Sequence, residues 1–217
     1  LKVLKGSLLM PGCGGGPDFK QVRMARLEEV TGDFQVFNSP GMERVYLPML
    51  TTVGNLRMEA NESLNEVNLP ALESVSGDLT ITHGNMVRLD MPALESVGGM
   101  LSIRILSALE TFSFPKLEET EYLILTHLDS LSSFAFPELE SLEGVILRQN
   151  DALNGFELPM VTELPGASRI HDNAWLSQLD MPHLESAGQL EIYSNDQLEE
   201  IRFSSLTSVE NLFFESK

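Results

Sequence analysis

The sequence predicts an all-β fold, a single parallel β-solenoid of about nine turns. An apolar residue followed by proline, or its equivalent, recurs every 22 or 23 residues over most of the chain. A period this regular is typical of a solenoid in which each turn packs only on its neighbours. The dipeptides that mark the turns begin at Met24, Leu47, Leu69, Met91, Phe114, Phe136, Leu158, Met181 and Phe203.

Two short segments in each turn alternate apolar and polar residues. In the turn that starts at Leu69 they are 79–81 and 89–91. Such alternation is typical of a strand with one buried face. Twenty-two residues are too few for two strands, their turns and a full helix. We therefore predict a β-only core, in which the buried positions include Leu79, Leu101, Val145 and Leu190.

Prolines and asparagines mark the predicted corners. The repeated proline is expected to open a strand at a corner, where its missing N–H need not join a ladder. Pro40 and Pro165 lie outside that column, and we predict loops for both. A second column holds asparagine and is interrupted near Leu106 and at Leu128. Its members are Asn38, Asn61, Asn150, Asn173 and Asn195, with Asn85 displaced by one.

Composition and charge limit the classes of partner. The net charge is −18, from 32 acidic and 14 basic residues, which disfavours nucleic acid and anionic lipid. No run of 18 apolar residues exists, so we predict no transmembrane span. We divide the chain into an N-terminal segment, residues 1–24, and one repeat solenoid, residues 25–217.

The N-terminal segment has two interpretations. The amino-acid sequence up to Cys13, which is followed by three glycines, resembles the end of a bacterial lipoprotein signal, in which the cysteine is acylated. Alternatively, the segment is a degenerate first turn or cap, with Leu1 and Leu4 equivalent to Leu47 and Leu50. The single cysteine permits no intramolecular disulfide in either case.

The repeat text resembles a known superfamily. Residues 53–61 and 142–150 read LxxLxLxxN, which is similar to the leucine-rich repeat. The fuller pattern LPxLExVxGxLxIxxNxxLxxL resembles the receptor L-domain-like repeats of fungal cell-wall GPI proteins and bacterial surface proteins, over residues 25–217. The resemblance implies a right-handed, β-rich solenoid with a binding or structural role at the cell surface, and it supplies no catalytic residues. We expect an extracellular or surface location, lipid-anchored if Cys13 is acylated.

Two polar columns are predicted beside the first strand. One is rich in glutamate, and we expect it to be a solvated face; the alternative is a surface for a divalent cation or a cationic partner. The other is rich in hydroxyl groups, and we expect its side chains to hydrogen-bond to the backbone of their own turns. The alternative for this column is a carbohydrate-binding surface. The first column is Glu28, Thr51, Glu73, Glu95, Glu118, Glu140, Thr162, Glu185 and Thr207. The second is Glu29, Thr52, Ser74, Ser96, Glu119, Ser141, Glu163, Ser186 and Ser208.

No catalytic, cofactor or metal site is predicted. The sequence contains none of the motifs GxSxG, HExxH or a Walker loop, and a period without long insertions leaves no room for a catalytic groove. His83, His127 and His171 are 44 residues apart. They should lie nearly in line but about 10 Å apart, which is too far for one shared ion.

A partner surface is predicted in the middle turns. Ile124 and Ile146 point outward one turn apart, next to the break in the asparagine column, and contiguous apolar patches often mark interfaces. The alternative is that Leu106 and Leu128 turn inward and the isoleucines are only good strand formers. The predicted contact residues are Ile124, Ile146, His127 and Arg148, with Trp175 and Tyr193 as a smaller second candidate.

The function that we expect is a non-enzymatic, surface-exposed binding or adhesion scaffold for a protein or glycan. The alternative is a structural spacer of a longer cell-envelope protein. A β-helix carbohydrate-active enzyme is a remote third, because the net charge opposes an acidic polysaccharide substrate. The chain reaches Lys217 in mid-turn after Phe213 and Phe214, so we expect the natural chain to continue or this end to self-associate.

Overall fold

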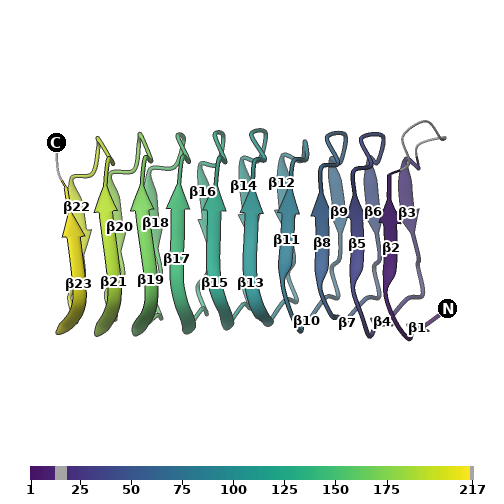
Figure 1. Ribbon diagram of the computed structural model, residues 1–217, viewed down its shortest axis with the longest axis horizontal. Helices are drawn as coiled ribbons and strands as arrows, with labels where there is room; N and C mark the ends of the chain where they lie inside the picture. Colours follow the sequence, from purple (N-terminus) through teal and green to yellow (C-terminus); the bar gives the residue numbers. More distant parts are fainter. Residues whose placement is uncertain (13–18, 216–217) are drawn as a thin grey trace.

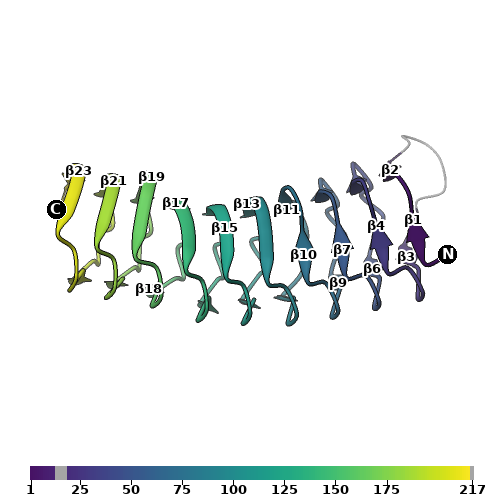
Figure 2. The ribbon, with the colours of Figure 1, turned by 90° about the horizontal axis from the view of Figure 1, so that it is seen from below.

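The chain folds as a parallel β-solenoid, which confirms the predicted fold class (Figure 1). The computed structural model describes residues 1–12 and 19–215, and these residues contain strands and turns but no helix. In Figure 1 the near strands run upward, the chain passes behind them, and each turn lies farther left than the one before. The solenoid therefore winds in a right-handed sense. Seen from below, the turns stand side by side between termini at opposite ends (Figure 2).

One long sheet runs the length of the molecule. Its order is β1-β4-β7-β10-β13-β15-β17-β19-β21-β23. In the first four turns the strand is split in two, and from β13 onward the two parts merge into one. The split strands are β1 (Val3–Leu4) and β2 (Leu8–Pro11), β4 (Glu29–Val30) and β5 (Phe34–Phe37), β7 (Thr52–Val53) and β8 (Leu56–Glu59), and β10 (Ser74–Val75) and β11 (Leu79–Thr82). The merged strands are β13 (Ser96–Arg104), β15 (Glu119–Thr126), β17 (Ser141–Arg148), β19 (Glu163–His171), β21 (Ser186–Tyr193) and β23 (Ser208–Phe214).

A second side of the solenoid carries three short parallel sheets of three strands each. Each turn thus has two strand segments on different sides, as the two alternating segments predict. The first sheet is β3 (Gln21–Arg23), β6 (Arg44–Tyr46) and β9 (Glu66–Asn68); the second is β12 (Arg88–Asp90), β14 (Thr111–Ser113) and β16 (Ser133–Ala135); the third is β18 (Gly155–Glu157), β20 (Gln178–Asp180) and β22 (Glu200–Arg202).

The space between the sides is filled by stacked apolar columns. Leu79, Leu101, Val145 and Leu190 are all 0% exposed, which confirms the predicted core positions. Equivalent residues of successive turns lie one strand spacing apart, so each core side chain packs on its copies above and below. In the middle turns the second side is aromatic, where the rings of Phe112 and Phe134 stack with centroids 5.0 Å apart.

The repeated proline stands at a corner, but it does not open a strand. In the turn of Pro70, the Leu72 N–H donates to the Leu69 carbonyl at 3.2 Å, which closes a β-turn with proline at its second residue. Proline is favoured there because its ring fixes φ near the value that the turn requires. The proline therefore follows the second strand of each turn, and the prediction was right about the corner and wrong about the strand.

The other corner follows the long strand and uses a left-handed residue. In the turn of Asn61, the Leu64 N–H donates to the Asn61 carbonyl at 2.8 Å, and the residue before Asn61 has a positive φ. Among the described residues none of these positions is glycine. They are Asn38, Ala60, His83, Ile105, His127, Gln149, Asp172 and Ser194, with φ of 51–56°.

The asparagine column differs from the prediction by one residue at its start. Asn61, Asn150 and Asn173 are 0% exposed, but Asn38 occupies the left-handed position and Ser39 stands in the column, where its N–H donates to Asn61 Oδ1 at 3.1 Å. The left-handed residue points outward and the next residue points inward. Ser39 rather than Asn38 therefore occupies the inward column. Leu106 and Leu128 fill the interrupted positions and are buried at 0% exposure, which confirms that both leucines turn inward.

Pro165 lies within β19 and not in a loop, so that prediction was wrong. The pairing of β19 with β21 shifts register between Leu164 and Ala167. A bulge leaves one residue unpaired, and proline is tolerated there because no ladder hydrogen bond is lost. Pro40 lies in a turn, as predicted.

Residues before position 25 also belong to the long sheet. Val3 pairs with Glu29, and Leu4 pairs with Val30, so the solenoid includes a turn ahead of the boundary that we placed at residue 25. Leu4 is equivalent to Val53, through Val30, and not to Leu50. The difference arises because apolar residues recur three positions apart at this corner. Cys13 lies outside the described residues.

Candidate binding face

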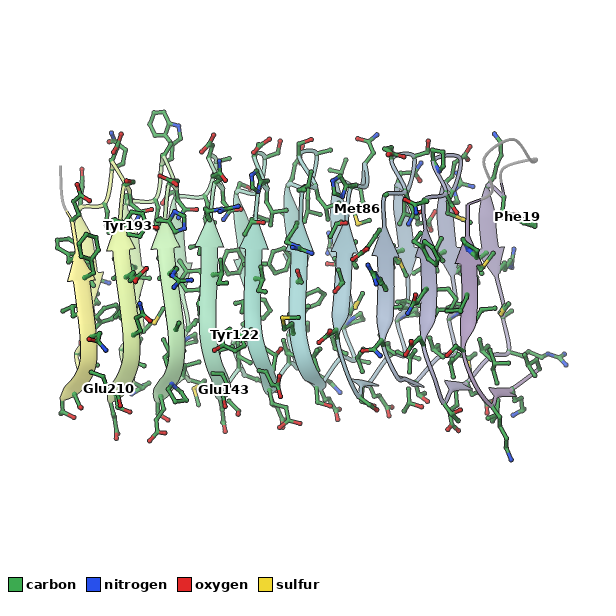
Figure 3. The ribbon with its side chains drawn as sticks, in the orientation of Figure 1. Phe19, Met86, Tyr122, Glu143, Tyr193 and Glu210 are labelled. Carbon is green, nitrogen blue, oxygen red and sulfur yellow. The ribbon has the colours of Figure 1, made fainter. Side chains whose placement is uncertain are left out.

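Acidic residues gather along one edge of the solenoid, where the long strands begin. The glutamate column forms a backbone ladder, in which the Glu95 N–H donates to the Glu73 carbonyl at 2.8 Å and the Glu118 N–H to the Glu95 carbonyl at 2.9 Å. Figure 3 shows Glu143 and Glu210 at the same lower edge. The register also confirms the hydroxyl column, for example Ser74 between Thr52 and Ser96. The glutamate column therefore lies just before the long strands begin, as Glu95 precedes β13 and Glu118 precedes β15.

The outward face of the sheet is different in its middle. We define the middle face as the outward residues in the second parts of three strands, from Met100 in β13, Tyr122 in β15 and Gly144 in β17, with the left-handed residue after each strand. No residue of this set is a carboxylate, whereas the first parts of β15 and β17 expose Glu119, Glu121 and Glu143. The middle face consists of Met100, Ser102, Arg104, Ile105, Tyr122, Ile124, Thr126, His127, Gly144, Ile146, Arg148 and Gln149.

The structure brings four of the six predicted contact residues together. Ile124 pairs directly with Ile146, and Thr126 pairs with Arg148. The His127 N–H donates to the Arg148 carbonyl at 3.1 Å. Both isoleucines are partly exposed and point away from the core, between Leu123 and Leu125 in one strand and between Val145 and Leu147 in the next.

The second candidate pair does not form one surface. Trp175 is 65% exposed and lies on a corner turn, where it lines a hollow with Ala152, Asn154, Ser177, Gln197 and Glu199. Tyr193 ends β21 on the sheet face, and its ring stacks on His171 with centroids 4.6 Å apart. The two residues hold different positions within the repeat, one on a corner and one on the sheet.

Tyr122 and Met100 belong to the face although the sequence analysis missed them. The register of β13 against β15 shifts between Val97 and Met100, so that Met100 pairs with Tyr122. Met100 alternates with the buried Leu101 and points outward at 38% exposure. Tyr122 pairs with Gly144. A Cβ on Gly144 would lie 2.8 Å from Tyr122 Cε1, and one on Gly166 would lie 2.3 Å from its hydroxyl oxygen. The tyrosine side chain therefore lies across two glycines.

The arginines of the middle face have no acidic partners. On either side of the middle face, Arg57 of β8 pairs with Glu59 and Arg169 of β19 pairs with Glu191. The hydrogen bond to Glu59, with its charge, raises the pKa of the Arg57 guanidinium above its ordinary value against a smaller opposing effect of burial. Arg104 and Arg148 form no side-chain hydrogen bond or ion pair with any described residue.

A shallow hollow adjoins the middle face on its N-terminal side. Its volume is about 490 Å³, and it extends from the ends of β5 and β8 to the end of β13. Arg104 and Ile105 line its far wall and belong also to the middle face. The remaining lining is Gln35, Phe37, Asn38, Arg57, Glu59, Ala60, Thr82 and His83.

The three histidines are not equivalent, contrary to the prediction of a line. His83 and His127 both occupy the left-handed corner position, whereas His171 lies one residue earlier in its turn, at the end of β19. After His127 the left-handed corner residues are Gln149 and then Asp172, and the second of these turns has 23 residues. A separation of 44 residues from His127 therefore places His171 one position before the corner residue. Among residues 1–12 and 19–215, no three His, Cys, Asp or Glu side chains are grouped as a metal site requires.

These features define a class by architecture: a β-solenoid with an acidic edge and a basic and apolar middle face. No protein-family model matches the chain, and no curated protein matches it. In the described part of the chain, no helix is long and apolar enough to cross a bilayer.

Proposed function

We propose that this protein is a non-enzymatic binding scaffold that recognises its partner, a protein or a glycan, through the middle face. The observation that carries the proposal is the pairing of Ile124 with Ile146 beside the row that holds the two unpaired arginines, Arg104 and Arg148. A regular rod has no need of such a departure from its other turns. Contiguous exposed apolar residues with a polar rim are typical of interaction sites.

The location and the family remain parts of the same proposal. The repeat text is similar to the receptor L-domain-like branch of the leucine-rich repeats, whose members act at cell surfaces. A surface location agrees with a strongly acidic solenoid, and acylation of Cys13 would anchor it. A sheet face built from rigid, fully paired strands supports binding because little conformational entropy is lost when a ligand docks.

The test compares the wild-type chain with Ile124→Thr/Ile146→Thr on protein and glycan arrays. Threonine keeps β-branching, so the strands are expected to remain intact, while the apolar patch is lost. We expect fewer or weaker interactions for the double variant. Val87→Thr is the matched control, because Val87 is 51% exposed but lies outside the middle face.

Two results would count against the proposal. Identical array profiles for the double variant and the wild type would remove the middle face from recognition. No binding by the wild type to any protein or glycan would favour the spacer, in which the solenoid serves only to set a distance.

A further inference from the structure

Unpaired polar atoms are concentrated on the middle face. Among the described residues, five buried side-chain nitrogen or oxygen atoms lack a hydrogen-bond partner: Ser102 Oγ, Arg104 Nε, His127 Nδ1, Arg148 Nε and Asp180 Oδ1. Four of these five belong to three adjacent turns of one face. Buried polar groups are nearly always hydrogen-bonded, so such a cluster requires an explanation.

Comparable groups elsewhere on the sheet face are satisfied. His83 occupies the same corner position as His127, and its Nδ1 lies 2.9 Å from Thr82 Oγ1. Arg169, which is paired with Ile146 and so lies one row from Arg148, donates from Nε to Glu191 at 2.9 Å. The unpaired state is therefore a property of these particular turns and not of the repeat.

The unpaired atoms are suited to an acceptor-rich, negatively charged ligand. The arginine Nε–H groups can only donate, and the serine hydroxyl and the imidazole nitrogen can also donate. Ser102 is only 3% exposed and points outward on β13, two residues before Arg104, between Thr80 of β11 and Ile124 of β15. Hydrogen bonds between ionised groups are stronger than neutral ones, so an anion here would gain more than a neutral acceptor.

We propose that the middle face binds an acidic glycan, a linear polysaccharide with carboxylate groups, laid along the solenoid axis with its carboxylates on Arg104 and Arg148. This inference rests on the proposed binding function and specifies its ligand. Arg104, Thr126 and Arg148 occupy one column, so the two guanidinium groups originate about 10 Å apart. In a linear polyuronate, which carries a carboxylate on every sugar, the carboxylates of alternate sugars recur over a comparable length.

The shape of the face favours a glycan over a peptide. The strands here are paired on both sides within the solenoid, so no sheet edge is free to add a peptide strand. Recognition must use side chains on a flat surface. Tyr122 lies flat against the glycine backbone beside the isoleucines, and the apolar face of a sugar ring can stack on such a surface while its hydroxyls bond to Ser102 and Thr126.

The net charge of −18 does not prevent this binding. Its carboxylates lie mostly along the strand-start edge, and interactions between exposed charges are screened over about 8 Å at physiological ionic strength. Because the two arginines are unpaired, we expect their contacts with the glycan to dominate, so the affinity should decrease as salt is added. An increase would mean that repulsion between the acidic edge and the glycan dominates.

The experiment is a calorimetric titration of the whole chain with a galacturonic acid oligosaccharide, its methyl ester and a polyglutamate peptide. We expect the free acid to bind, and the ester and the peptide to bind at least about tenfold more weakly, because charge-assisted hydrogen bonds and sugar stacking are both required. Arg104→Gln/Arg148→Gln should lose at least about tenfold for the free acid. Arg88→Gln, whose arginine pairs with Asp90 on the second side of the solenoid, is the control and should bind as the wild type does.

Each outcome is decisive once circular dichroism has shown that the variants keep the wild-type spectrum. Absence of binding, equal affinity for the ester, or an unaffected arginine double variant would overturn the assignment of an acidic glycan. Equal affinity for polyglutamate would assign the face to acidic peptides instead. If the free acid does not bind while an array partner is still lost in the isoleucine double variant, the inference fails but the proposed binding function stands.

Discussion

Replacing Asn173 by alanine should destabilise the solenoid more than any exposed asparagine replacement. Asn173 is 0% exposed, and its Nδ2 group donates to the Leu147 and His171 carbonyls, both at 3.0 Å. Its Oδ1 accepts the Asn150 N–H at 3.2 Å. The alanine variant therefore leaves three backbone groups without this partner in a buried corner. At about 1 kcal/mol or more for each, the expected loss is about 3 kcal/mol.

Urea denaturation followed by circular dichroism measures the change, because the midpoint shifts with stability when the slope is constant. Asn85→Ala is the matched control. Asn85 is exposed, and only its backbone N–H is bonded, to the Leu64 carbonyl at 2.8 Å. We expect the control to change stability by less than about 0.5 kcal/mol. A loss below about 1 kcal/mol for Asn173→Ala would refute the idea that the asparagine ladder holds this corner.

Three further substitutions test other parts of the structure. Leu147→Ala should cost about 2 to 4 kcal/mol, because a fully buried side chain is replaced by a cavity; a loss under about 0.5 kcal/mol in the same denaturation assay would contradict the assigned register. Gly144→Ala should cost about 1 to 3 kcal/mol, because its Cβ would lie 2.7 Å from the Ala167 carbonyl oxygen, whereas Gly155→Ala meets nothing within 4 Å and should be nearly neutral by thermal melting. Ile105→Asn should stabilise the chain by about 1 kcal/mol, because a β-branched residue is strained at a φ of 55°; unchanged or lower stability in urea would show that contacts of the isoleucine outweigh the strain.

Much of the architecture was determined by the sequence because the period is nearly constant. In a solenoid, residues one period apart become neighbours on adjacent strands, so a sequence offset becomes a position in space. This is why the buried columns, the glutamate ladder and the pairing of Ile124 with Ile146 were predicted correctly. The alternation within each strand then decided which residues faced the core.

The tertiary structure decided what a constant period cannot specify. A bulge changes which residues of two neighbouring strands lie side by side, so the pairing of Met100 with Tyr122 and the place of Pro165 within a strand depended on irregularities in β13 and β19. Likewise, Ser39 replaced Asn38 in the inward column because one residue adopts a left-handed φ.

The composition of the middle face was also a tertiary result. Net charge is a property of the whole chain, whereas an ion pair depends on which side chains share a face. Only the folded solenoid separates the carboxylate edge from Arg104 and Arg148 and leaves both arginines unpaired beside Ser102 and His127. The sequence alone determined the rod and its core because burial repeats with the chain, but the site required the structure because it depends on departures from that repeat.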